Sequence, residues 1–170
     1  LLFDGTTTQG WRGVHKSAFP EKGWKVENGA LIVVSSGGAE SQNGGDIITE
    51  DQYSTFELLL DFKIPEGANS GIKYFITEGY DSGGSAIGLE YQILDDANHA
   101  WMLEGKMSPC DYHTLGSLYE IYPASCDKAP APLGEWNSSR IVSRNGEVDH
   151  WLNGKLILSF NRFSEDVRQK

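Results

Sequence analysis

Long apolar runs, clustered positive charge and cysteine pairs with metal-binding spacing are all missing from this sequence. No stretch of about 18 consecutive apolar residues occurs, which excludes a membrane-spanning helix. Lys and Arg number 14 against 24 Asp and Glu, so the net charge is −10, and no basic patch is visible. Nucleic acids and anionic membranes bind clustered positive charge, so neither is an expected partner.

Cysteine is scarce, with Cys110 and Cys126 at the two ends of one loop-rich stretch. They form either a disulfide, in an oxidising compartment, or two free thiols. Without a CxxC or His-x-His spacing they are a weak metal signal. The sequence also has no Gly-x-Ser-x-Gly elbow, phosphate loop or dinucleotide fingerprint, so no nucleotide or organic cofactor is expected.

Turn signals, in contrast, are plentiful. The 170 residues fit one domain, and 20 glycines separate short apolar runs, which is typical of an all-β protein. Asn-Gly pairs at 28–29, 145–146 and 153–154 each divide two apolar runs. Because both residues of the pair tolerate positive φ, they predict tight hairpins. The last two predict a three-stranded meander over 136–160.

Apolar residues alternate with polar ones in the segments 55–63, 71–77 and 87–94, as in half-buried strands. No helix of ten residues is expected, although short turns could form near 96–103 and 164–169. The sum is about eight to ten strands joined by antiparallel hairpins. The sequence therefore predicts an all-β fold, a two-sheet jelly-roll sandwich.

Glu90 and Gln92 are the first candidate site residues. They share one face of the predicted strand at 87–94, opposite Leu89, Tyr91 and Ile93, which supply the core. A carboxylate and an amide about 7 Å apart on one face can hold vicinal sugar hydroxyls or a metal ion. We expect both side chains to open into a cleft on a concave face. The alternative is a face that is merely solvated.

The irregular segment 95–115 is long for a compact domain, and such loops are usually functional or disordered. It starts where the Glu90 strand ends, so it can fold back over that strand. Glu90, Asp95 and His113 would then form an acid–base set, with His113 within roughly 12 Å of the Glu90 carboxylate. Trp101 would be a platform for a sugar ring. The competing view is a surface loop with no site role, in which Asp95 is a turn residue.

Two polar residues at the predicted strand 71–77 complete the set of candidate site residues that residue patterns indicate. Asn69 lies in a loop that enters the strand at 71–77, and Lys73 is a polar residue of that strand. Both are candidates for substrate binding. The alternative interpretation of Asn69 is a plain turn.

Seven short motifs, in order over nearly the whole chain, resemble the 3-keto-disaccharide hydrolase family. They are LFDG at 2–5 with Gly10-Trp11, WKVENGAL at 24–31, NSGI at 69–72, EYQILD at 90–95, Leu118-Tyr119, GEWN at 134–137 and WLNG at 151–154. The resemblance implies a concanavalin A-like fold of the lectin/glucanase type. It also implies a bacterial, exported enzyme.

The resemblance further implies a glycoside already oxidised to a ketone at sugar carbon 3. The ketone acidifies the proton on carbon 2, so a base can remove it, the glycosidic oxygen is eliminated from carbon 1, and water adds back. Such chemistry needs a base and enolate stabilisation, for which a divalent metal ion is often used. The family's site positions fall on Glu90, Gln92, Asp95 and Tyr119, with His113 just upstream.

Two further expectations concern the two ends of the chain. Family members usually continue to a last strand with Gln-x-His-Gly and Phe-Arg-Asn patterns, whereas this sequence stops at Lys170, which predicts one β-sandwich domain over 1–170 without that strand. The abrupt start at Leu1 predicts a leader that has been removed, and hence a periplasmic or secreted protein. The alternative to an enzyme is a non-catalytic carbohydrate-binding module of a secreted or cell-surface protein.

Overall fold

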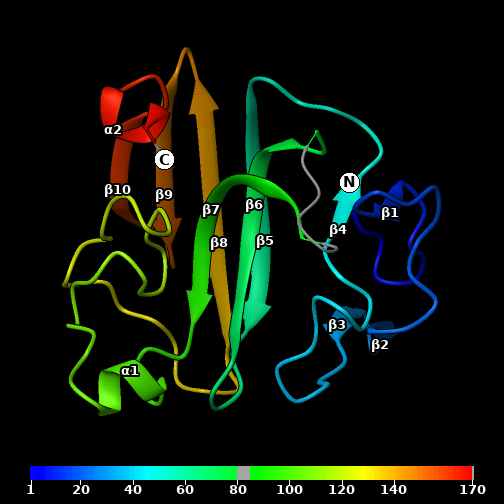
Figure 1. The fold of residues 1–170 in the computed structure, drawn as a ribbon, viewed down its shortest axis with the longest axis horizontal. Helices are drawn as coiled ribbons and strands as arrows, with labels where there is room; N and C mark the ends of the chain where they lie inside the picture. The colour runs from blue at the N-terminus through cyan, green and yellow to red at the C-terminus, as the bar shows by residue number, and fades with distance from the viewer. Residues whose placement is uncertain (80–84, 170) are drawn as a thin grey trace. The chain divides into compact units, whose positions relative to one another are not determined.

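Strands dominate the regular structure. The computed structural model describes residues 1–79 and 85–169, with 38% strand and 5% helix, which confirms the all-β prediction. Ten strands occur among the described residues, within the predicted range. In chain order the elements are β1 (Trp11–Gly13), β2 (Trp24–Glu27), β3 (Ala30–Val33), β4 (Ile47–Thr49), β5 (Phe56–Lys63), β6 (Asn69–Thr77), β7 (Ile87–Leu94), α1 (Ala100–Leu103), β8 (Trp136–Arg144), β9 (Glu147–Leu152), β10 (Lys155–Asn161) and α2 (Glu165–Arg168) (Figure 1).

The three Asn-Gly pairs form the predicted hairpins. Both residues of each pair have positive φ, 52° and 77° at 28–29, 53° and 89° at 145–146, and 49° and 80° at 153–154. These values match the turn that suits the twist of antiparallel strands. β2 pairs with β3, β8 with β9 and β9 with β10, so the predicted meander is confirmed and β10 ends one residue later than expected.

The chain divides into two compact units. The first contains Leu1–Tyr53 and Phe75–Gly88, where β1 pairs antiparallel with β4, and β2 with β3. The second contains Ser54–Tyr74 and Leu89–Lys170. All eight candidate site residues named above fall in the second unit. Within residues 1–79 and 85–169, no helix has the length and apolar character needed to cross a bilayer.

A four-stranded antiparallel sheet, in the order β10-β9-β8-β5, forms one layer of the second unit (Figure 1). On β5, residues 56, 58, 60 and 62 are buried or half-buried, whereas 57, 59, 61 and 63 are exposed, as the alternation predicts. Leu58, Ile141 and His150 are aligned across three strands on the inner face. Ile141 and His150 are fully buried, so this row belongs to the core.

β6 and β7 are hydrogen-bonded to one another, and a tyrosine of each strand contacts the four-stranded sheet of this unit. Tyr74 of β6 and Tyr91 of β7 both contact His150, with 2.6 Å from the Tyr74 hydroxyl to Nε2 and 4.8 Å between the Tyr91 and His150 ring centroids. Nδ1 of His150 lies 2.8 Å from the carbonyl oxygen of Gly116. Since a carbonyl can only accept, Nδ1 carries the hydrogen, and the Tyr74 hydroxyl donates to Nε2.

Strand β6 departs from the regular alternation expected for 71–77. It begins two residues earlier than predicted, at Asn69, and Phe75 adopts a left-handed backbone with φ of 54°. Such a φ is rare for a bulky residue outside a turn. The regular alternation expected for 71–77 is therefore interrupted at Phe75, the residue at which the chain passes from one unit to the other.

Candidate functional site

The loop after β7 folds back along that strand, as the sequence predicts. The N–H of Gly116 donates to the carbonyl of Gln92 at 2.8 Å, and the N–H of Gln92 donates to the carbonyl of Ser117 at 3.1 Å. Further along, the N–H of Tyr119 donates to the carbonyl of Glu90 at 3.1 Å. These backbone bonds place Tyr119 directly beside Glu90, so the chain returns to the sheet at this point.

Glu90 is half-buried and lies close against the neighbouring strand. A Cβ atom added to Gly71 of β6 would stand 1.8 Å from Oε1 of Glu90, so the carboxylate occupies the space that a side chain at 71 would need. The negative charge of Glu90 also acts on the hydroxyl of Tyr119. Glu90 is thus held between β6 and Tyr119. Lys73, two residues beyond Gly71, is also half-buried.

The expectation that Gln92 opens into a cleft is wrong. Its side chain is 3% exposed, and its Nε2 donates to Oδ1 of Asn69 at 3.3 Å. The physical reason is the path of the loop, because the backbones of Gly116 and Ser117 bond to Gln92 and enclose this part of β7. Asn69 itself is exposed and is therefore the more accessible member of the pair.

Asp95 is buried and holds the start of the loop. Its carboxylate accepts the N–H of Gly67 at 2.9 Å, and the N–H and side-chain Nδ2 of Asn98 at 3.4 and 2.8 Å. Burial raises the pKa of Asp95, but these hydrogen bonds outweigh it, so the pKa lies below its usual value. The carboxylate oxygens are occupied by N–H donors, an arrangement that suits a loop anchor better than a base.

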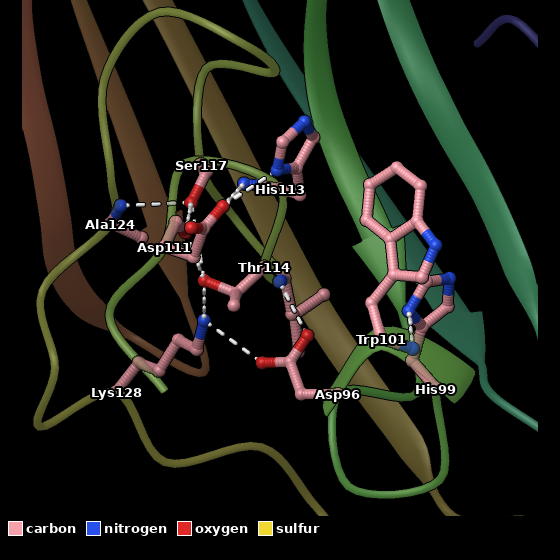
Figure 2. A network of polar contacts seen from close by, with 10 residues as sticks. Asp96, His99, Trp101, Asp111, His113, Thr114, Ser117, Ala124 and Lys128 are labelled. Carbon is pink, nitrogen blue, oxygen red and sulfur yellow. Dashed lines mark hydrogen bonds and ion pairs between the residues drawn. The ribbon is translucent and has the colours of Figure 1, made fainter. Parts of the chain in front are cut away.

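His113 is oriented by an acidic neighbour that sequence reasoning missed. Its Nδ1 lies 2.6 Å from Oδ1 of Asp111, and the same oxygen accepts the N–H of His113 at 2.9 Å (Figure 2). Within residues 1–79 and 85–169, no group hydrogen-bonds to Nε2 of His113. A carboxylate on Nδ1 fixes the tautomer in which Nε2 is the acceptor, as a general base requires. The spacing Asp-x-His in a turn was the available signal.

Aromatic rings surround this histidine. The ring centroid of His113 lies 4.4 Å from that of Tyr112, 5.3 Å from Tyr119 and 5.4 Å from Trp101. Trp101 is on α1, which His99 caps by accepting the N–H of Trp101 at 3.3 Å (Figure 2). Trp101 and Tyr112 are 45% and 42% exposed, so each offers ring surface to a ligand. We call Trp101, Tyr112, His113 and Tyr119 the aromatic cluster.

Tyr119 connects the aromatic cluster to the strand. Burial raises the pKa of its hydroxyl, and the negative charges of Glu120 and Glu90 raise it further. The phenol therefore stays protonated near neutral pH and can donate a hydrogen bond. The ring of His113 contacts the ring of Tyr119, and the backbone carbonyl of Glu90 accepts the N–H of Tyr119, so both residues are neighbours of this tyrosine.

The candidate residues do not assemble a cation site in the described part of the chain. Three or more His, Cys, Asp or Glu side chains do not converge anywhere in residues 1–79 and 85–169. The oxygens of Asp95 accept N–H donors, and Asp111 holds His113. The carboxylates of Asp95 and Asp111 are therefore already engaged by hydrogen-bond donors of the protein.

Comparison with known proteins identifies relatives along the full chain. The family model of a 3-keto-alpha-glucoside-1,2-lyase-like domain matches residues 1–170. A 3-keto-disaccharide hydrolase from Bacteroides thetaiotaomicron is 35% identical over 175 residues, which cover 96% of this chain and 59% of that protein. The chain thus spans about three-fifths of this relative's length.

Two solved structures from Parabacteroides distasonis are also similar, both of proposed glycosyl hydrolases. One is 33% identical with a TM-score of 0.80, over 99% of this chain and 74% of that one. The other is 28% identical with a TM-score of 0.64, over 89% and 72%. The resemblance drawn from the seven motifs is confirmed, and the chain belongs to the 3-keto-alpha-glucoside-1,2-lyase-like family.

Proposed function

We propose that this protein is a hydrolase-type enzyme that cleaves 3-keto-glycosides, including 3-keto-disaccharides, by elimination and hydration. The observation that carries the proposal is the Asp111–His113 pair, set among aromatic rings beside Tyr119 and Glu90. The family and the Bacteroides relative's name support the substrate class. A module that only stacks sugar rings would not need a histidine oriented by a carboxylate.

In the first step, Nε2 of His113 takes the proton from carbon 2 of the 3-keto sugar. The C–H electron pair moves toward the ketone and forms an enolate. Asp111 holds Nδ1 and stabilises the positive charge that forms on the imidazole. The rings of Trp101 and Tyr112 would hold the apolar faces of the sugar so that carbon 2 faces the base.

In the same step, the protonated Tyr119 hydroxyl donates a hydrogen bond to the developing enolate oxygen. A fixed donor in a partly desolvated site stabilises such an oxyanion more than water does. Lys73 and Asn69 are assigned to substrate binding, as the sequence predicts. Glu90 sets the electrostatic environment of Tyr119, because its negative charge raises the pKa of that phenol.

In the second step, the enolate collapses: the carbonyl at carbon 3 re-forms, a new double bond forms between carbons 1 and 2, and the bond from carbon 1 to the glycosidic oxygen breaks. The proton on His113 passes to the departing oxygen, which restores the neutral base. Water then adds across the double bond, its hydroxyl to carbon 1 and its proton to carbon 2. The products are the free 3-keto sugar and the aglycone.

The remaining expectations belong to the same proposal. The strands would connect as a concanavalin A-like jelly roll, and the protein would act in the periplasm or outside the cell. The substrate is a neutral carbohydrate, and the net charge of −10 disfavours nucleic acid as a partner.

Turnover of a 3-keto-disaccharide labelled with deuterium at carbon 2 tests the proposal. We expect release of the 3-keto sugar, a slower rate with the deuterated substrate, and loss of the label to solvent. Oxygen-18 from labelled water should appear at carbon 1. EDTA should leave the rate unchanged, whereas loss of activity restored by Ca²⁺ or Mg²⁺ would show that a metal takes part.

A histidine variant adds a matched control. His113→Gln should lower kcat by about 10²–10⁴, the range for an acid–base group. His15→Asn changes an exposed histidine of the other unit, at a left-handed φ that Asn tolerates, and should leave kcat unchanged. Sugar binding without turnover in the unmodified protein would favour the carbohydrate-binding module instead.

A further inference from the structure

The Asp111–His113 pair sits on irregular chain, so something other than a strand or helix must fix its position. The backbone carbonyl of Asp111 accepts three hydrogen bonds from two residues further along the loop. Its donors are the N–H and Oγ1 of Thr114, at 3.1 and 2.8 Å, and Oγ of Ser117, at 3.3 Å (Figure 2). Thr114 and Ser117 are fully buried, so this turn is shielded from competing water.

Lys128 reaches the same turn from a segment further along the chain. Its Nζ donates to Oγ1 of Thr114 at 2.7 Å and lies 3.0 Å from Oδ2 of Asp96 (Figure 2). An ammonium group can only donate, so the Thr114 hydroxyl must accept from it and direct its own hydrogen to the carbonyl of Asp111. The hydrogen bonds therefore run in one direction, from Lys128 through Thr114 to Asp111.

Asp96 closes the arrangement on the other side. Its second oxygen, Oδ1, accepts the N–H of Leu115 at 2.8 Å, so one carboxylate holds both the ammonium and the loop backbone. The disulfide between Cys110 and Cys126 joins the same two segments covalently, next to Asp111 and two residues before Lys128. Two independent links thus bring the 126–128 segment against the turn that carries the histidine.

Burying the ammonium group of Lys128 costs solvation free energy, so its presence in this place needs an explanation. Its side chain is 7% exposed, and burial lowers the pKa of its ammonium while the charge of Asp96 offsets part of that effect. Replacing a buried ion pair by apolar residues is often neutral or stabilising, so such a pair is weak support for stability alone. A role in fixing one geometry accounts for a charge in this place.

We propose that Lys128 and Thr114 are positioning residues for the Asp111–His113 pair: the hydrogen bonds from Lys128 through Thr114 fix the turn that aims Nε2 of His113. The inference rests on the proposed function for its kinetic consequence. The geometry of the pair itself can be measured whether or not the substrate is a 3-keto-glycoside. Neither residue touches substrate in this scheme.

The kinetic test uses matched substitutions at Thr114. Thr114→Val keeps the shape and removes the hydroxyl, and should lower kcat by about 10–10² with KM changed less than about threefold, because a displacement near 1 Å can cost 10² in rate. Thr114→Ser keeps the hydroxyl and should return kcat to within about threefold of the unmodified enzyme. A rise in KM with unchanged kcat, or equal losses in Val and Ser variants, would overturn the inference.

A second experiment tests Lys128 without leaving the buried charge of Asp96 unpaired. The double variant Lys128→Met with Asp96→Asn removes both charges and keeps an acceptor for Leu115, and should lower kcat as Thr114→Val does. Lys155→Met is the control, since it removes an exposed ion pair to Asp127, the residue beside Lys128. The control should stay within about twofold in kcat. An unchanged kcat in the double variant would refute the role of Lys128.

Nitrogen-15 spectra of the imidazole separate this inference from the proposed function. The Nδ1 proton of His113, identified by its loss in His113→Gln, should shift or broaden in Thr114→Val and return in Thr114→Ser. If the unmodified protein turns over no 3-keto-glycoside, the proposed function fails while this spectral change still supports the positioning role. An unchanged Nδ1 signal in both Thr114→Val and the double variant would overturn it.

Discussion

Gly71→Ala displaces Glu90 without altering its charge. The new Cβ would stand 1.8 Å from Oε1, 2.6 Å from Cδ and 2.8 Å from Cγ of Glu90. Ordinary contact needs about 3.5 Å, so the carboxylate must move by about 1.7 Å. Gly71 lies in β6 outside the left-handed φ region, so alanine fits its backbone. The main consequence is therefore a misplaced carboxylate beside Tyr119.

A displacement of that size predicts a fall of about 10² in kcat/KM, since 1 Å of misplacement can cost as much. Stability should change by less than about 1 kcal/mol, because alanine at a compatible site stabilises slightly and offsets the shift. The assay is steady-state release of the 3-keto sugar, with thermal unfolding in parallel. Gly79→Ala is the control, as its Cβ would meet only Oγ1 of Thr77 at an ordinary 3.5 Å.

A double-mutant cycle makes the test specific for Glu90. Glu90→Gln alone should lower kcat/KM by about 10², as expected for loss of a correctly placed carboxylate beside Tyr119, and leave the fold intact. If Gly71→Ala acts through this carboxylate, adding it to Glu90→Gln should cause little further loss, because the two changes are coupled. Fully additive losses, or full activity in Gly71→Ala, would refute the reasoning that Glu90 must lie where the structure has it.

Three other predictions concern single residues. Tyr119→Phe should lower kcat by about 10²–10³ with little change in KM, the cost of one oxyanion donor, and a loss confined to KM would assign Tyr119 to ground-state binding. Asp95→Asn should lower the free energy of unfolding by about 1–3 kcal/mol and leave kcat near normal, whereas a large loss of kcat in folded protein would restore its predicted catalytic role. Burial lowers the pKa of His150 to about 4, below the usual 6.5, so neutral His150 stabilises the fold above pH 6.5 and this contribution falls as the pH drops toward 4. Urea unfolding should give about 2 kcal/mol less at pH 5 than at pH 7, and a His150→Gln variant that shows the same loss would contradict this assignment.

Strands and turns could be predicted because their signals are local. An Asn-Gly pair and its flanking alternation specify a hairpin within a dozen residues, which is why the boundaries of β8 and β9 agree so closely with the pattern. The left-handed residue at Phe75 has no such signal. Its neighbours in sequence read as an ordinary strand, and the interruption coincides with the junction of the two units.

The residue types of the candidate site could be predicted from the sequence, but the contacts between those residues could not. The loop's length and its Trp101 and His113 indicated a site, and its path beside β7 followed from where it starts. The enclosure of Gln92 and the bond from Lys128 to Thr114 depend on residues 14 or more positions apart, which no local pattern encodes. His150 was missed for the same reason, since its hydrogen-bonding partners lie 34 and 76 residues away.

The backbone bonds between β7 and the returning loop have a consequence for self-association. An exposed strand edge presents unpaired N–H and C=O groups that recruit strands of other molecules. Here the carbonyl of Glu90 accepts the N–H of Tyr119, the N–H and carbonyl of Gln92 bond to Ser117 and Gly116, and Leu118 forms an isolated β-bridge with Tyr91. The loop that carries the proposed chemistry therefore also occupies this edge. Variants that loosen it are expected to aggregate as well as to lose activity.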